Sequence, residues 1–243
     1  MAISYFPSSA DAERYRRLRT LGRTLSDRIF KTVPHNAYDE IAEVLGILRN
    51  GTLVFETEDV AGVLADSCVY DWYEDGKNVV QRYAETHPAR PGTDEAYLLD
   101  AYRQARYGVL AVQSAVRDAG LYCYDVLNQE ELFVMDRGFS QTLPNGRIAL
   151  ATRLVPLGNY WMTGGAALPI ASADALNPII EKAGSRLTGP PLAGHAPFPT
   201  LAIRACLNSG AAEHIVYSGT GSRPNLRPRL PSSLGSKRRP RLY

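Results

Sequence analysis

The chain has 243 residues, 45% of them hydrophobic and 21% charged, which is enough apolar length for one or two folded domains. No stretch approaches the roughly 18–20 uncharged residues of a membrane-spanning helix, and Asp11, Glu13 and Arg14 interrupt the apolar run that a signal peptide needs. The three cysteines are far apart and odd in number, which argues against a disulfide framework and a zinc knuckle. These features exclude a disordered polymer and membrane insertion, and they predict a cytoplasmic protein.

The first predicted element is a helix over residues 9–33. Its apolar side chains recur at steps of three and four, and six arginines lie among them. Ser8 or Ser9 can cap the N-terminus, and Pro34 is expected to end the helix. The pattern is therefore that of an amphipathic helix with one apolar face.

The rest of the first half is also expected to be mostly helical. A second helix is predicted to follow Asn36 as its cap and to end at Asn50-Gly51, which would supply a left-handed exit. Further elements expected in chain order are a short strand at 53–55, a helix at 60–72, a turn at Asp75-Gly76, a short helix at 79–83 and a helix opened by Thr93.

The hydrophobic period changes to two after about Tyr107, which is typical of strands. Turn signals such as Pro144-Asn145-Gly146 recur about every 8–12 residues from there to about residue 170. Five or six short strands close most readily into a small antiparallel barrel or a strongly bent sheet, because a flat sheet would leave exposed edges. Helical spacing returns at 175–183 and at 201–207.

The net charge of +2 conceals an uneven distribution. Residues 218–243 hold seven basic side chains and no acidic one, so subtraction leaves −5 for the chain before them. This tail is rich in Pro, Ser and Arg and poor in large apolar residues, which predicts disorder. Its unopposed cations can attract phosphates or acidic surfaces. The candidate polyanion-binding residues are Arg223, Arg227, Arg229, Lys237, Arg238, Arg239 and Arg241.

These elements predict an α+β fold, with an N-terminal helical region, a small antiparallel β-barrel or bent sheet, a short helix and a disordered basic tail. The expected segments are 1–106 mainly helical, 107–170 barrel-like, 171–217 short helical or irregular, and 218–243 the tail.

About half of the chain, residues 51–170, resembles a family of uncharacterised bacterial proteins that carry the SEC-C motif. That motif is a short zinc-binding tail also found in the protein-translocation ATPase, and the resemblance implies the fold. The matching segments are Gly51–Glu56, Asp66–Gly76, Tyr124–Leu127 continuing to Leu132–Asp136, Ala151–Gly158 and Gly164–Pro169.

The zinc site of that family does not carry over. Its motif holds the metal with a Cys-x-Cys pair followed by Cys-Cys or Cys-His, whereas the corresponding stretch here, around Leu234–Arg239, has no thiolate. Hydroxyl and guanidinium groups do not replace thiolates on Zn²⁺. We therefore expect neither zinc nor another cofactor.

The acidic group at 66–75 is the clearest candidate for chemistry. Asp66, Asp71, Glu74 and Asp75 could hold a divalent cation or supply an acid and a base. The spacing of a calcium-binding loop is absent, so a solvated helix end and turn is the favoured interpretation, with the neighbouring aromatics packing the helices on the barrel.

The remaining candidate site residues are expected to have structural roles. The four histidines lack the spacing of a metal-binding helix, and Cys123 is expected to be a buried thiol rather than a nucleophile. Asp136-Arg137-Gly138 with Arg153 could form a cross-strand ion pair or an anion-binding rim, and the ion pair is favoured.

The sequence therefore favours a non-enzymatic binding or adaptor protein with a protein partner that the residues do not name. One alternative is a nucleic-acid-associated protein that uses the tail together with exposed barrel aromatics such as Tyr122, Tyr124 and Phe133. The other is an enzyme that uses the acidic region 66–75. An exposed aromatic stack would favour the first alternative, and carboxylates converging in a pocket would favour the second.

Overall fold

The computed structural model describes residues 5–49, 52–53, 58–142, 149–170, 177 and 197–208, and these form an α+β fold. The helices are α1 (Ser9–Phe30), α2 (His35–Leu45), α3 (Glu58–Tyr70), α4 (Val79–Thr86), α5 (Asp94–Arg103), α6 (Arg137–Thr142) and α8 (Phe198–Asn208). The strands are β1 (Leu48–Arg49), β2 (Thr52–Leu53), β3 (Tyr73–Glu74), β4 (Lys77–Asn78), β5 (Arg106–Val116), β6 (Gly120–Asp125), β7 (Glu130–Val134), β8 (Ala149–Pro156) and β9 (Trp161–Ile170).

Helix α1 begins at a capping box, and Ser8 is the cap. The Ser8 hydroxyl accepts a hydrogen bond from the Asp11 amide at 3.1 Å, while the Asp11 carboxylate accepts from the Ser8 amide at 3.0 Å. These bonds from Ser8 lower the pKa of Asp11. The apolar face predicted for this helix is buried, with Leu18 and Leu25 fully enclosed.

The predicted boundaries of the second helix are wrong at both ends. Helix α2 begins at His35 after Pro34, and Asn36 donates to Glu40 at 2.9 Å instead of capping. The helix ends at Leu45 because Gly46 adopts the left-handed conformation, at φ 77°, that closes a helix. Asn50-Gly51 lies outside the described residues.

The elements in the middle of the chain agree with those predicted from the local sequence. Asp75 and Gly76 have φ of 52° and 75°, the conformation that a two-residue hairpin turn requires, and they join β3 to β4. A capping box between Asn78 and Gln81 opens α4, and Thr93 caps α5 as predicted.

The predicted barrel is confirmed as a closed barrel of five strands in the order β5-β6-β7-β9-β8. Strand β5 pairs with both β6 and β8, and its register shifts between Val112 and Ser114. Such an irregularity bends a strand and helps a small sheet to close. Four of the strand pairs are antiparallel, but the pair that closes the barrel, β7 with β9, is parallel and is registered only at Val134 and Trp161. Gly120 is required near this point, because a Cβ there would lie 2.1 Å from the Val134 carbonyl oxygen.

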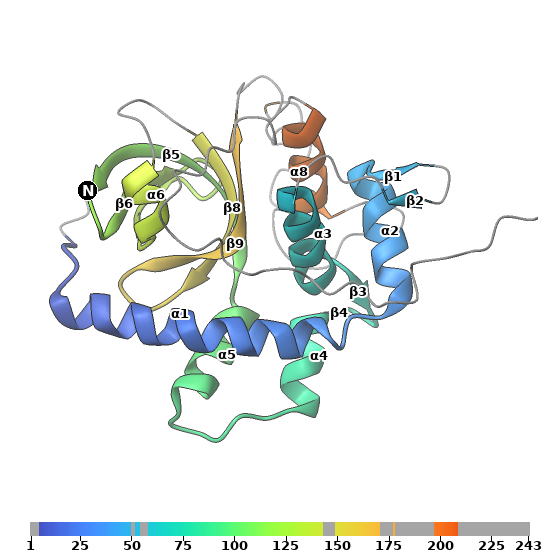
Figure 1. The fold of residues 1–243 in the computed structure, drawn as a ribbon, viewed down its shortest axis with the longest axis horizontal. Coiled ribbons are helices and arrows are strands. Elements are labelled where there is room, and N and C mark those ends of the chain that lie inside the picture. The colour runs from blue at the N-terminus through green and yellow to red at the C-terminus, as the bar shows by residue number, and fades with distance from the viewer. Residues whose placement is uncertain are drawn as a thin grey trace, which may run out of the picture.

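The barrel and the helices share a hydrophobic core. The barrel has its own interior around Leu110, Cys123 and Leu150, and its outer face packs on the helices through residues such as Val109 and Val155. Figure 1 shows α1 running along both the barrel and the helical group, with α4 and α5 on its other side. The division of the chain into domains stays a prediction.

Helix α8 confirms the helical spacing predicted at 201–207. The helix predicted at 175–183, apart from residue 177, and the basic tail at 218–243 lie outside the described residues. No helix in the described ranges is both long enough and apolar enough to cross a membrane.

Candidate functional site

Two acidic residues of the predicted group meet a barrel arginine in a buried cluster. Asp66 lies on α3, Asp71 follows that helix directly, and Arg153 comes from β8. The Arg153 Nη2 atom donates to the Asp71 Oδ2 atom at 2.6 Å and to the Asp66 Oδ2 atom at 3.0 Å. The side chains of Arg153 and Asp71 are only 3% and 4% exposed. The prediction of a solvated helix end is therefore wrong for Asp66 and Asp71.

The neighbours of Arg153 enclose the cluster further. The rings of Tyr70 and Tyr107 lie 4.7 and 5.2 Å from the guanidinium carbon, at distances typical of cation–π contacts. Gly164 on β9 leaves the space for this arrangement, because a Cβ at that position would lie 2.8 Å from the Cβ of Arg153. We call Asp66, Asp71 and Arg153 the carboxylate cluster.

The carboxylate cluster holds two acidic groups and one basic group away from water. Burial raises the pKa of Asp71 to about 6, although Arg153 opposes the shift. Burial also raises the pKa of Asp66 against the same attraction. For Arg153, burial opposes the charged form, but the two carboxylates raise its pKa. The cluster therefore joins α3 to the barrel and favours the uptake of one proton.

The other two acidic residues of the group behave as predicted. Glu74 forms an ion pair with Arg82 on the surface, and Asp75 occupies the β3–β4 turn. The aromatic residues between them also pack as expected, since Trp72 is buried and donates to the Glu40 carboxylate at 2.8 Å.

The predicted pair between the Asp136 region and Arg153 is wrong. Asp136 instead accepts a hydrogen bond from the Thr163 hydroxyl at 2.6 Å and lies 3.8 Å from Arg19 of α1. It also accepts from the amide of Phe139, which places it at the start of α6. The partners of Arg153 come instead from α3 and the residue that follows it.

The barrel aromatics named in the alternative function do not form one exposed stack. Phe133 is 1% exposed, and Tyr122 and Tyr124 are half-buried. Tyr122 packs on Phe133 with ring centroids 5.0 Å apart and donates its hydroxyl hydrogen to the Tyr5 carbonyl at 2.6 Å.

The remaining candidates among the described residues lie apart from one another. His35 is exposed at the start of α2, and His87 stacks on Tyr83 with centroids 4.5 Å apart. Cys123 is a buried thiol, as predicted, and burial raises its pKa to about 12. Within the described ranges, no three His, Cys, Asp or Glu side chains form a metal-binding group. His195, His214 and the seven candidate polyanion-binding residues lie outside those ranges.

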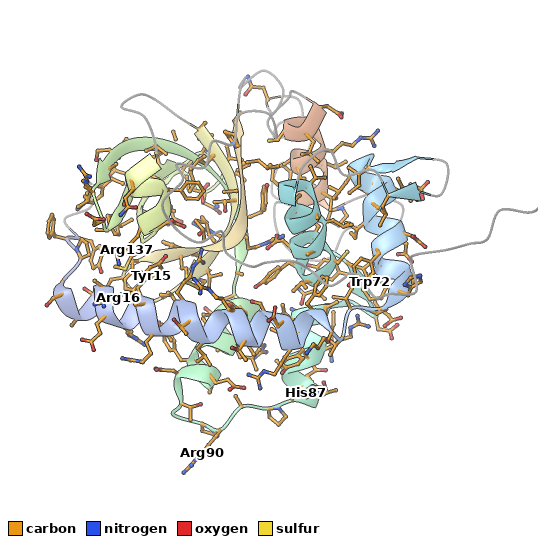
Figure 2. All side chains as sticks on the ribbon, in the orientation of Figure 1. Tyr15, Arg16, Trp72, His87, Arg90 and Arg137 are labelled. Atoms are coloured by element: carbon orange, nitrogen blue, oxygen red, sulfur yellow. The ribbon has the colours of Figure 1, made fainter. Side chains whose placement is uncertain are left out.

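A hollow lies where α1 begins beneath the barrel. Its volume is about 170 Å³, and its walls come from the first turns of α1, the β5–β6 turn and the residues that follow β7. Ala12, Tyr15, Ala119 and Met135 give it an apolar lining. Figure 2 shows Tyr15 and Arg137 on this side of the molecule, with His87 and Arg90 beyond α1.

The rim of this hollow is polar, and an exposed aromatic residue directly precedes a segment that lines it. Arg137 and Asp118 are both about half exposed, with their charged groups 3.8 Å apart. Phe6 is 73% exposed and lies directly before Pro7 and Ser8, which also line the hollow. Local sequence patterns did not indicate this site because its walls come from three distant segments. The available signal was the Tyr5-Phe6 pair outside the apolar period of the helix.

A family model, DUF7986, a family of unknown function, matches residues 9–182, which is well over half of the chain. The chain belongs to this family. The comparison with curated proteins and the comparison with solved structures found no match. The DUF7986 match includes the carboxylate cluster and most of the hollow, whereas Phe6, Pro7, Ser8 and the basic tail lie outside it.

Proposed function

We propose that this DUF7986 protein is a non-enzymatic binding or adaptor protein of the cytoplasm that holds an apolar side chain of a partner polypeptide in the hollow beside α1. The observation that carries the proposal is the apolar hollow, together with the exposed Phe6 that directly precedes Pro7 and Ser8 in its wall. Large exposed apolar side chains next to a concave surface mark interaction sites in many proteins.

The size of the hollow suits one anchor side chain. An apolar cavity of about 150 Å³ accommodates benzene, and the hollow measures about 170 Å³. A phenylalanine, leucine or methionine side chain is therefore the class of group that it would take. Interfaces commonly draw most of their binding energy from a few anchors of this kind.

The rim supplies the polar part of such an interface. Arg137 and Asp118 offer one charge of each sign at the edge, where they remain in contact with water. Rim charges contribute to orientation and association rate more than to affinity. A partner with one acidic and one basic residue beside its anchor would complement them.

The test uses N-acetylphenylalaninamide as the probe and NMR of the methyl groups of Ala12, Ala119 and Met135 as the readout. About 15 non-hydrogen atoms at roughly 0.3 kcal/mol each give a dissociation constant of about 1 mM. We expect saturable shifts at these three methyl groups. The variant Ala119→Leu fills the hollow and should weaken binding at least tenfold.

The matched control is Ala115→Leu, which adds the same side chain at an exposed position of β5. It should leave the titration unchanged. Absence of saturable shifts in the wild-type protein, or equal titrations of the two leucine variants, would overturn the proposed function.

The resemblance to SEC-C motif proteins supports a binding role but stays a hypothesis, as does binding of nucleic acid through the basic tail. The tail hypothesis depends on the seven cations of residues 218–243. We do not propose an enzyme based on residues 66–75, because Asp66 and Asp71 are bound to Arg153 in a buried cluster.

A further inference from the structure

The segment Tyr5–Ser8 lies against the barrel in front of α1, and Tyr5 occupies a place among three aromatic rings. The centroid of the Tyr5 ring is 5.6 Å from that of Phe133 and 6.1 Å from that of Tyr160. The Tyr122 hydroxyl donates to the Tyr5 carbonyl oxygen at 2.6 Å. We call Tyr122, Phe133 and Tyr160 the aromatic slot.

The aromatic slot belongs to the barrel framework. Tyr122 and Phe133 are directly paired residues of β6 and β7, and Tyr160 immediately precedes β9. Phe133 and Tyr160 are 1% and 2% exposed. Tyr5, in contrast, belongs to a segment without regular secondary structure. The slot is therefore held by strands, and its occupant is held by a short stretch of chain.

The contacts of Tyr5 are those of a bound peptide residue. A ring packs on aromatic faces, and the backbone carbonyl accepts one side-chain hydrogen bond. Neither contact depends on where in a polypeptide the tyrosine lies. The next residue, Phe6, projects into solvent and does not help to hold Tyr5 in the aromatic slot.

The fit of Tyr5 is incomplete. The Tyr160 hydroxyl is buried and makes no hydrogen bond with a described residue, whereas the Tyr5 hydroxyl interacts with the Asp11 carboxylate. Buried polar groups of this kind are uncommon in native structures, because each loses its bonds to water without replacing them. An occupant that satisfies the Tyr160 hydroxyl would bind the slot better than Tyr5 does.

We propose that the aromatic slot is a recognition site for an extended polypeptide segment carrying a tyrosine, and that Tyr5 covers it as a tethered ligand of the same chain. A partner segment binds when it displaces Tyr5. The inference adds a second, adjacent contact to the proposed binding function, and it does not require that the hollow bind anything.

The covalent linkage of Tyr5 to the chain determines how much its removal should raise the affinity for an added segment. A ligand on a short flexible linker has an effective concentration in the millimolar range, so it competes strongly with a segment in solution. Removing the Tyr5 side chain should therefore raise the apparent affinity of an added segment by about tenfold or more. The increase should be specific for segments with tyrosine at the corresponding position.

The probe is a fluorescein-labelled peptide with the sequence of residues 3–9, Ile-Ser-Tyr-Phe-Pro-Ser-Ser, and the readout is fluorescence anisotropy with the full chain. Tyr5→Ala should bind this peptide at least tenfold more tightly than the wild type. The same peptide with alanine in place of tyrosine should show no such gain. Leu201→Ala is the matched control, because it alters an exposed apolar side chain on α8 and leaves the slot covered.

A second variant guards against a folding defect in Tyr5→Ala. Deletion of residues 1–7 removes the tethered ligand and keeps Ser8, which caps α1. This variant should show the same gain, and adding Tyr122→Phe should reduce it, because the hydrogen bond to the peptide carbonyl is lost.

Equal peptide affinity of the wild type and both uncovered variants would overturn the inference, and so would equal binding of the alanine peptide. The proposed function fails independently, in the titration of the Ala12 and Ala119 methyl groups. Peptide binding that shifts only those methyl groups would support the hollow and contradict the slot.

Discussion

The carboxylate cluster and the N-terminal end of α1 are two places where the barrel meets the rest of the chain, and they differ in how their polar groups are satisfied. In the cluster, every charged group is held by another charged group of the same chain. At the N-terminal end, the buried Tyr160 hydroxyl has no partner among the described residues, and the large aromatic side chain of Phe6 faces water. The charged groups of the carboxylate cluster are paired without a ligand, whereas groups at the N-terminal end of α1 could still contact one. We therefore place stability in the cluster and recognition at the end of α1.

The strongest test of this comparison removes the cation of the cluster. Arg153→Met leaves Asp66 and Asp71 buried without their partner, and breaking a buried pair in this way costs about 3–5 kcal/mol. Urea denaturation at pH 7.5 should show a loss of this size in the free energy of unfolding. Arg137→Met, at the half-exposed rim of the hollow, should change it by no more than about 0.5 kcal/mol. Similar losses in the two variants would contradict the comparison.

The free energy of unfolding should depend on pH because the carboxylate cluster takes up a proton as the pH falls. The pKa of Asp71 is raised from 3.8 to about 6, so its contribution is fully present below pH 3.8 and is lost as the pH rises through 6. The full contribution is about 3 kcal/mol, of which about 1 kcal/mol should appear between pH 7.5 and pH 5.

The measurement compares urea unfolding of the wild type and Asp71→Asn at both pH values. The wild type should gain more than Asp71→Asn on acidification, because asparagine does not titrate whereas Asp66 remains in both proteins. An identical pH dependence of the two proteins would show that Asp71 does not bind the proton.

Smaller effects are expected in the aromatic slot. Tyr122→Phe removes a satisfied hydrogen bond to the Tyr5 carbonyl and should lower the free energy of unfolding by about 1 kcal/mol. Tyr160→Phe removes a buried hydroxyl that has no partner among the described residues, so it should leave stability unchanged or raise it slightly. Thermal unfolding of Tyr122→Phe and Tyr160→Phe compares the two losses, and a larger loss in Tyr160→Phe would show that the Tyr160 hydroxyl is satisfied.

The basic tail should have the smallest effect on stability and a separate effect on binding. Truncation to residues 1–217 removes seven cations, and affinity for a single-stranded oligonucleotide should fall strongly if they bind phosphates. Filter binding at two salt concentrations should give a log–log slope of several units for the full chain. Equal binding by both proteins would direct the search to the folded part, and binding by neither would remove the nucleic-acid alternative.

Elements with a local cause could be predicted from the sequence. The period of α1, the Ser8 cap, the Asp75-Gly76 turn and the alternating strands of the barrel depend on residues close together in the chain, and the structure confirms them. The cap of α2 was predicted wrongly because Asn36 was weighed without Pro34, which already fixes the start of that helix.

The partners of Arg153 could not be predicted in the same way. Asp66 and Asp71 lie 87 and 82 positions away in sequence, and only the packing of α3 on the barrel brings them together. A local pattern favoured Asp136, which is nearer in sequence but contacts Thr163 and Arg19 instead. The hollow was missed for the same reason, since its lining joins α1 to a turn more than a hundred residues later.

The single registered contact between β7 and β9 gives the aromatic slot a mechanical role. Phe133 lies on β7 and Tyr160 immediately precedes β9, so the Tyr5 ring contacts both sides of the seam at which the barrel closes. At that seam the Met135 amide donates a hydrogen bond to the Trp161 carbonyl at 2.8 Å. Local opening of a fold begins where the fewest interactions must break. A residue in the slot therefore holds β7 and β9 together where the barrel closes. If a partner segment replaced Tyr5, the partner would determine how readily these two strands separate.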